Sequence, residues 1–571
     1  MIEAAETQTG RKRRTADFPR LVEALDYAAH GRGGLTFYGS RGRVEDVVRW
    51  PDLQARATAT AGRLRSRGLA PGDRVAILAE TSGGFVEVLL ACMAAGLAPC
   101  PTPLPVAFGS REDYTEHLGR MIEAVSCRAV VAPDAFADWV TEGLGDRGLV
   151  FAGGLAELDG APDALPSGAV DEDEIAYVQF TSGTTGGPKG VEVTHRALME
   201  NIRAMAVGLG GVGDDDRGAF WLPFYHDMGL VGALMLPIAC QASVDLMSTR
   251  TFTMRPGLWT EIMSRNRSTM SFAPSFGYDL AARRAKASGD LDLSSWRVAG
   301  VGGDMVHPRA LSDFAERFAS AGFRPEAFMP SYGMAEACLG LCFSAPDRAP
   351  VFERVDADRL VATGEAAPAS DAARSAELAR CGPPLPGNRI EIRDEDDAPL
   401  PERRVGRIMA SGPSLMRGYA GAPEETASVL GADGWLDTGD LGYLVDGELV
   451  ITGRAKDMIA INGRNIWPGE VEISLQDAVE GLRASGVGVL RDPDALSDID
   501  VARVTIVLEC RTKDAEERER LAKEALSVVR ERHGLVADVV LCGPRQLPRT
   551  TSGKLRRAEA RRMLKAGELT G

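Results

Sequence analysis

The chain lacks several patterns that mark common protein classes, and each absence narrows its possible functions. None of the nine cysteines belongs to a CxxC pair, which argues against a zinc ribbon or a dithiol redox centre. The first residues lack the apolar core of a signal peptide, so we expect a cytoplasmic protein with reduced thiols. Basic residues are outnumbered, 65 Lys and Arg against 81 Asp and Glu, which argues against a nucleic-acid-binding surface.

Long apolar runs are also missing. The most apolar stretch, residues 85–108, contains Glu87 early and prolines from Pro99 onward, so its uninterrupted part is shorter than the roughly 20 residues of a membrane-spanning helix. We therefore expect a buried helix followed by an extended segment, and no transmembrane segment.

Histidine is scarce as well, because the chain has only six, and none lies at ligand spacing from the His226-Asp227 pair. A metal site at this pair is therefore not expected.

A chain of 571 residues exceeds what one hydrophobic core usually sustains, so we expect two or more domains. Short apolar strands alternate with helical patterns at residues 75–78, 129–131, 175–180 and 298–300. This alternation predicts an α/β fold, with parallel-rich sheets flanked by helices.

The pattern changes toward the end of the chain. From about residue 390 it is typical of a β-rich subdomain, and Asp446-Gly447 predicts a hairpin turn. Strands and helices alternate again in the last part. The predicted domains are an N-terminal domain of residues 1–454 and a small α+β C-terminal domain of residues 455–571.

The strongest chemical signal is the segment YVQFTSGTTGGPKGVEV, residues 177–193. Its glycines allow close backbone approach to an anion, its hydroxyls lie beside main-chain N–H donors, and its lysine adds a positive charge. The candidate phosphate-binding residues are Thr181, Ser182, Gly183, Thr184, Thr185, Gly186 and Lys189. The segment is not a GxxxxGK[ST] loop, because no Ser or Thr follows Lys189. Strand-like flanks on both sides favour a binding loop over a flexible linker.

This loop resembles that of the adenylate-forming superfamily, which includes acyl-CoA synthetases, peptide-synthetase adenylation domains and luciferases. Further motifs similar to those of the family follow in the family's order: WLPFYHDMG from Trp221, SYGMAEA from Ser331, DTGDLG from Asp437, GRAKDMI from Gly453 and RTTSGKLRR from Arg549. Together they cover nearly the whole chain. The resemblance implies that ATP and magnesium (Mg2+) are used, and that the C-terminal domain is a mobile lid.

The resemblance also implies roles for individual residues. Glu336 corresponds to the acid that holds magnesium, with Thr184 beside it, and Lys554 to the catalytic lysine that bridges the substrate carboxylate and the α-phosphate. His226 lies where the family joins the acid pocket to the nucleotide site, and Lys456 corresponds to the hinge. The other implied contacts to ATP are Gly303, Asp304, Ser331, Tyr332 along the adenine, Gly333, Met334, Ala335, and Asp440 and Arg454 at the ribose.

Three details resemble one branch of the superfamily, the fatty acyl-AMP ligases, which deliver acyl groups to the phosphopantetheine of an acyl carrier protein. They are the WLPFYHDMGL motif, the alanine at position 335 before the magnesium acid, and the added segment Val351 to Pro386. The chain has neither a GxDS carrier motif nor a GxSxG motif, so the holo acyl carrier protein is expected to be a separate partner.

The predicted acid pocket is apolar and offers no counter-ion for an amino acid. Its candidate residues are Met228, Leu230, Met235, Phe276 and Tyr278, and they favour a fatty acid substrate. A fatty acyl-CoA ligase that uses free CoA remains the main alternative, because it shares every nucleotide motif. A non-catalytic acyl- or nucleotide-binding protein is the second alternative, but it would be expected to lose Lys554 or Glu336.

Overall fold

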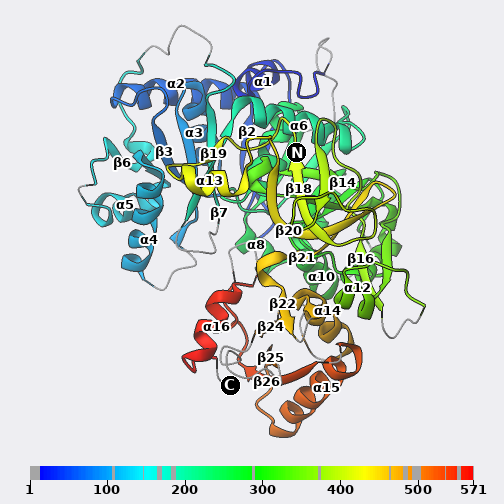
Figure 1. The fold of residues 1–571 in the computed structure, drawn as a ribbon. Helices are drawn as coiled ribbons and strands as arrows, with labels where there is room; N and C mark the ends of the chain where they lie inside the picture. The colour runs from blue at the N-terminus through cyan, green and yellow to red at the C-terminus, as the bar shows by residue number, and fades with distance from the viewer. Residues whose placement is uncertain are drawn as a thin grey trace.

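A computed structural model describes most of the chain (Figure 1). The described residues are 13–105, 110–145, 147–163, 170–181, 188–285, 290–370, 375–461, 464–479, 482, 486–491, 503–533, 535–549 and 555–569.

The largest sheet has eight strands in the order β14-β13-β12-β11-β9-β10-β1-β2. Its six inner strands are parallel, and β2 and β14 pair antiparallel at the two edges. The strands are β1 (Gly34–Tyr38), β2 (Val44–Arg49), β9 (Arg217–Phe220), β10 (Ser243–Met247), β11 (Met270–Ala273), β12 (Val298–Val301), β13 (Phe328–Gly333) and β14 (Gly340–Phe343). The strand predicted at 298–300 and the parallel-rich sheet are thus confirmed.

A second, fully parallel sheet has the order β4-β3-β5-β6. Its strands are β3 (Arg74–Leu78), β4 (Ala98–Thr102), β5 (Cys127–Ala132) and β6 (Phe151–Gly154). Helix α3 (Gly83–Ala94) precedes β4, so the apolar stretch from residue 85 is a buried helix followed by an extended segment, as predicted.

Helices cover the two sheets. Apolar side chains of α1, α2, α3, α6 and α7 share one core with strands of both sheets, while α9, α10 and α11 pack into an aromatic core beside the large sheet. The helices of this part are α1 (Leu21–Ala28), α2 (Trp50–Ser66), α4 (Arg111–Ala124), α5 (Ala137–Gly143), α6 (His195–Gly208), α7 (Leu236–Ala239), α8 (Thr249–Met254), α9 (Gly257–Arg265), α10 (Ser275–Arg284) and α11 (Pro308–Phe318).

Strand β7 (Ile175–Thr181) pairs antiparallel with β8 (Lys189–Thr194), and β19 (Gly418–Tyr419) adds a third strand. The strand prediction is confirmed, but this small sheet is not parallel. The reason is the short connection between β7 and β8, which can join only antiparallel neighbours, because a parallel pair needs a crossover of a dozen or more residues.

The β-rich subdomain is an antiparallel sheet in the order β17-β18-β20-β21. Asp446 and Gly447 connect β20 to β21 with φ of 52° and 74°, the left-handed pair of a tight hairpin turn. Its elements are β17 (Arg389–Arg393), β18 (Gly406–Ser411), α13 (Pro423–Val429), β20 (Leu436–Val445) and β21 (Glu448–Arg454).

The added segment forms a hairpin of β15 (Phe352–Asp356) and β16 (Ser375–Ala379), with helix α12 (Ala357–Thr363) between them. Arg380 ties the hairpin to the β20–β21 turn, since it pairs with Glu353 on one side and with Glu448, at 3.0 Å, on the other. The segment is therefore packed on the large N-terminal part.

The C-terminal part lies below the rest of the molecule in Figure 1. It has its own apolar cores, formed only by residues from 459 onward. Helix α12 contacts β23, and the two line a small pocket together with residues of α14 and α15. The elements are β22 (Ile459–Ile461), β23 (Arg464–Ile466), α14 (Pro468–Ala478), β24 (Val487–Arg491), β25 (Arg503–Glu509), α15 (Ala515–His533), β26 (Val536–Cys542) and α16 (Arg557–Lys565).

Within the described ranges, no helix is both long and apolar enough to cross a membrane. All nine cysteines are buried and free of disulfide bonds. Burial raises the pKa of several thiols well above the ordinary value, to about 12 at Cys240 and Cys381.

Candidate active site

Most of the candidate residues line one cleft of about 1660 Å³. It is lined by side chains from the phosphate-loop strands, the large sheet, the β-rich subdomain and the C-terminal part. The predicted residues that line it are Thr181, Lys189, His226, Met228, Gly303, Asp304, Ser331, Tyr332, Gly333, Met334, Ala335, Glu336, Asp440, Arg454 and Lys456.

Two parts of the predicted site lie outside the described residues. They are residues 182–187 of the phosphate loop, which include Thr184, and Lys554. Their described neighbours do line the cleft. Thr181 and Lys189 are cross-strand partners at the ends of β7 and β8, and Arg549 and Leu555 form an isolated bridge on the C-terminal side.

One end of the cleft is built on the hairpin of β20 and β21. Asp440 and Arg454 are cross-strand partners in this hairpin, and Arg454 Nε lies 3.3 Å from Asp440 Oδ1. The hydroxyl of Tyr332, on β13, donates to Asp440 Oδ2 at 2.8 Å. A carboxylate can accept several hydrogen bonds, so Asp440 is held in place and can still receive further hydroxyl donors.

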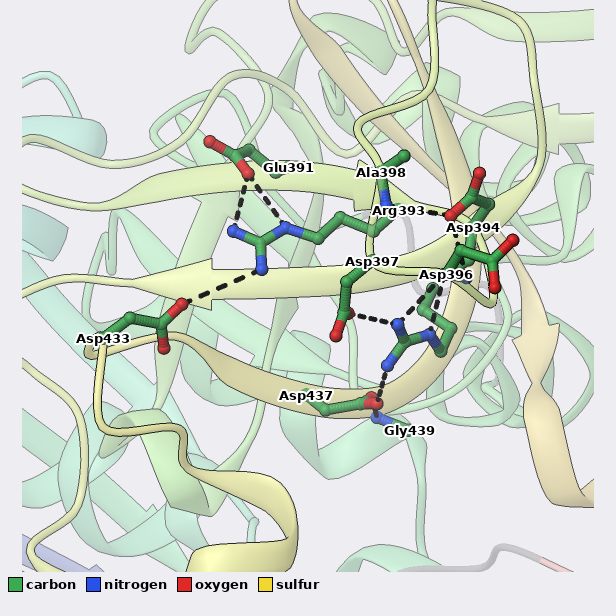
Figure 2. Close-up of polar contacts among 10 residues, drawn as sticks. Glu391, Arg393, Asp394, Asp396, Asp397, Ala398, Asp433, Asp437 and Gly439 are labelled. Carbon is green, nitrogen blue, oxygen red and sulfur yellow. Dashed lines mark hydrogen bonds and ion pairs between the residues drawn. The ribbon is translucent and has the colours of Figure 1, made fainter.

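Arg407 of β18 stabilises the turn that precedes Asp440. Its guanidinium donates to Asp437 at 2.9 Å and pairs with Asp397, and Figure 2 shows these two carboxylates meeting the same guanidinium. Asp437 also accepts from the backbone N–H of Gly439 at 2.9 Å. Asp437 therefore organises the turn, and both Asp437 and Asp440 line the cleft.

Glu336 is half-buried in the middle of the cleft. Tyr419, on β19, donates its hydroxyl to Glu336 Oε1 at 2.9 Å. Burial raises the pKa of Glu336, and the nearby negative charge of Asp227 raises it further, while the Tyr419 hydrogen bond and Arg454 act in the opposite direction. A cation at this position would offset the unfavourable burial of the carboxylate.

Lys189 lies close to the same tyrosine. Its Nζ is 5.1 Å from the centroid of the Tyr419 ring and forms an ion pair with Glu425 of α13. The positive charge at the end of β8 is thus directed toward the Glu336 region of the cleft.

The chain turns sharply just after Glu336. Cys338 has φ of 67° and ψ of −61°, and the N–H of Leu339 donates to the carbonyl of Ala337 at 2.8 Å, which defines a strained three-residue turn. Cys338 Sγ lies 3.4 Å from the hydroxyl of Tyr177 on β7. The turn therefore connects the Glu336 segment to the strand that leads into the phosphate loop.

His226 lies at the junction between the polar and apolar parts of the cleft. Its Nδ1 is 2.6 Å from Asp227 Oδ1, and the backbone N–H of Met228 donates to Asp227 at 2.7 Å. Gly303, with φ of 81°, adjoins this corner, because a Cβ there would lie 3.2 Å from the terminal methyl of Met228.

Beyond His226 the cleft continues as an apolar branch. Its lining residues come from α6 and the turn after it, β9, η4 (Met228–Met235), α7, β11 and β14, among them Met205, Leu209, Gly232, Leu236, Phe272 and Phe343. Of the predicted pocket residues, Met228 lines this cleft. Leu230, Met235, Phe276 and Tyr278 do not, because they pack in the apolar cores around it.

Several residues of the cleft were not predicted from the sequence. Tyr419 lies in the stretch RGYAGAPEE, which carries no local signal for a binding role, and so does Glu425, the ion-pair partner of Lys189. Met205 of α6 and Leu209, the residue directly after α6, follow an ordinary amphipathic pattern, and only the fold shows that they face the cleft.

Comparisons with known proteins agree with this geometry. The model of the family described as AMP-binding enzyme matches residues 41–420. A Caulobacter vibrioides protein named "Putative acyl-CoA synthetase" is 44% identical over 98% of both chains. The long-chain-fatty-acid–AMP ligase FadD26 of Mycobacterium tuberculosis is 33% identical over 90% of both chains. A solved structure from a study of fatty acyl-adenylate ligases from E. coli and L. pneumophila has a TM-score of 0.91 and 40% identity, covering 98% of this chain and 100% of that one.

Proposed function

Because this chain belongs to the AMP-binding enzyme family, we propose that it activates a fatty acid with ATP as a fatty acyl-AMP ligase and then passes the acyl group to a separate holo acyl carrier protein. The observation that carries the proposal is the shared cleft. Asp440, Tyr332 and Glu336 line the same cleft as Met228 and a group of apolar side chains.

The first half-reaction joins two anions. A carboxylate oxygen of the fatty acid forms a bond to the α-phosphorus of ATP, and the bond from that phosphorus to the oxygen of pyrophosphate breaks. The acid is already ionised at neutral pH, so no general base is needed, and His226 acts by positioning the substrate. Lys554 is proposed to stabilise the charge that develops between the carboxylate and the α-phosphate, since Arg549 and Leu555 on either side of it line the cleft.

The residues around Glu336 fit a magnesium ion bound together with ATP. No group of three or more His, Cys, Asp or Glu side chains is arranged for a metal within the described part of the chain, and magnesium usually binds one or two carboxylates plus substrate phosphates. Glu336, with Thr184 from the phosphate loop, would hold the ion. When bound, it would neutralise charge on the departing pyrophosphate.

In the second half-reaction, the phosphopantetheine thiolate of the carrier attacks the acyl carbonyl, and AMP leaves. We propose that residues 455–571 rotate as a lid between the two half-reactions, with Lys456 as the hinge. Contact between α12 and the C-terminal part supports a role for the added segment in limiting this rotation. Because the reaction needs ATP, the proposal keeps the cytoplasmic location predicted from the sequence.

A fatty acyl-CoA ligase is the second candidate. The Caulobacter relative bears an acyl-CoA synthetase name, and Arg556, Arg561 and Arg562 line the C-terminal side of the cleft, where a CoA phosphate or an acidic carrier could bind.

The deciding experiment supplies purified enzyme with ATP, magnesium, a panel of fatty acids and either free CoA or holo acyl carrier protein, and identifies the products by mass spectrometry. The expected products are acyl-AMP and acylated carrier protein, with little acyl-CoA. Robust acyl-CoA synthesis would instead favour the second candidate, and failure to form acyl-AMP from any fatty acid would reject both.

A further inference from the structure

The apolar branch of the cleft is bounded on one side by the π-helix η4 and its continuation into α7. Met228, Gly232 and Leu236 line the cleft at intervals of four positions, and Pro237 lines it next to Leu236. The first three form one face of the helical segment, which extends on the order of 10 Å along the branch at a helical rise. Gly232 is the middle residue of this face.

No backbone requirement explains the glycine at position 232. Its φ is not positive, and a Cβ there would contact a single atom within 4 Å, Cδ2 of Leu339 at 3.2 Å. At Gly229, in the same segment, a Cβ would lie 2.1 Å from the carbonyl oxygen of Pro223, so glycine is obligatory there. Glycine is unfavourable inside a helix, so its presence at 232 points to a need for space in the branch.

The far end of the branch reaches two charged residues, and both have partners. Asp216 is 2.7 Å from Arg297, and Arg217 is 2.6 Å from Asp245. Because these charges already neutralise each other, the end of the branch does not call for a charged group on the substrate. The neighbouring lining side chains, such as Met205, Leu209 and Phe220, are apolar, which suits an unsubstituted hydrocarbon chain.

We infer that Gly232 is a specificity-determining residue, which keeps the apolar branch open so that a long, uncharged acyl chain can pass the middle of η4. The inference rests on the proposed fatty acid activation and names the feature of the substrate that the branch selects. A side chain at position 232 narrows the branch beyond the reacting carboxylate, so long acids lose their binding site while short acids keep theirs.

The test compares the wild-type enzyme with Gly232→Ala and Gly232→Leu. Pyrophosphate release and acyl-AMP are measured with hexanoate, dodecanoate and hexadecanoate at saturating ATP and magnesium. For Gly232→Leu, kcat/KM for hexadecanoate relative to hexanoate is expected to fall by about tenfold or more, because extra methylenes in a packed site are strongly disfavoured. Gly232→Ala should give a smaller shift in the same direction. Val207→Leu, at an exposed position of α6, is the matched control and should leave the ratio unchanged.

Retained hexanoate activation with an unchanged KM for ATP establishes that the variants are folded. The inference is overturned if Gly232→Leu keeps the wild-type ratio, or if both variants lose activity equally toward every acid. If the wild-type enzyme activates none of the acids, the proposed function itself is wrong. This outcome is seen with the wild-type enzyme alone, so it is distinct from a failure of the inference about Gly232.

Discussion

At the scale of single residues, Lys554 carries the most direct test of the chemistry. Lys554→Ala should lower the rate of acyl-AMP formation by roughly 10²- to 10³-fold, because a charge aimed at the transition state is lost. ATP affinity should change little, since Asp440 and Tyr332 remain in place. Single-turnover formation of acyl-AMP and calorimetric ATP binding separate the two effects. Lys565→Ala, on the exposed side of α16, is the control. A nearly normal rate in a folded Lys554→Ala enzyme would remove the lysine from the mechanism.

Glu336 has a pKa raised by burial, and this gives a second prediction. Glu336→Gln should raise the magnesium concentration needed for half-maximal activity by about tenfold or more, because a hard cation prefers a charged oxygen ligand. In the wild-type enzyme the magnesium requirement should increase as the pH falls through the raised pKa, whereas the variant should lack this dependence. Activity measured over a grid of pH and magnesium concentration checks both.

The same shift has a consequence for folding stability. A carboxyl group with a raised folded-state pKa loses its stabilising contribution as the pH rises through that pKa, because the folded protein disfavours the ionised form. Glu336→Gln should therefore melt at the same temperature as the wild type, or a higher one, at neutral pH without magnesium. Tyr419→Phe keeps the charge but removes a hydrogen bond, so its magnesium defect should be smaller. A marked fall in the melting temperature of Glu336→Gln would contradict this account.

At the scale of elements, the short turn around Lys456 between β21 and β22 is the predicted hinge. Lys456→Pro fixes φ and should hinder rotation of the lid, so that acyl-AMP still forms while transfer to the carrier protein falls by about tenfold or more. The two half-reactions are assayed separately. Lys456→Ala removes the charge without stiffening the backbone, and transfer should then be largely retained. Equal loss of both half-reactions in Lys456→Pro would argue against two conformations.

Helix α12 provides the other prediction at this scale. Ala357, Asp358 and Val361 face Ile466, Trp467 and Leu535 of the C-terminal part across a small pocket. Val361→Asp should weaken this contact, free the lid and raise acyl-CoA formation relative to acyl-carrier protein by about tenfold, and deleting residues 357–363 should do so more strongly. Arg354→Ala, which changes an exposed side chain of β15, is the control. An unchanged product ratio would show that α12 is not the barrier to CoA.

The elements also show how far the sequence could be interpreted. Strands such as β3 and β5 were predictable because short apolar runs between turn signals have few other interpretations. The pocket residues were harder, because an apolar side chain near a motif is equally suited to a core. Tyr278, for example, donates to the carbonyl of Gly300 at 2.9 Å inside an aromatic cluster and does not line the cleft. Tyr419 contacts Glu336 across 83 positions of sequence, a pairing that depends on the fold alone.

At the scale of the whole molecule, the apolar cores of the described residues separate into two groups along the chain. Five clusters contain only residues before 454, and two contain only residues from 459 onward. We therefore expect residues 1–454 to fold alone with one cooperative thermal transition, to bind ATP, and to form no acyl-AMP because Lys554 is absent. Calorimetry and ATP titration of this fragment provide the test. An unfolded or aggregated fragment would place the boundary elsewhere.

The nine buried thiols can be used as natural probes of local unfolding. A thiol that is shielded from solvent reacts slowly with an alkylating reagent, so modification at each cysteine reports how often its surroundings become exposed. Seven cysteines lie before residue 454, and Cys510 and Cys542 lie after it. Peptide mass spectrometry of a timed alkylation would therefore give separate modification rates for the N-terminal and the C-terminal part in one sample. Addition of ATP should lower the alkylation rate of the cysteines in whichever part the nucleotide stabilises, and no engineered label is needed.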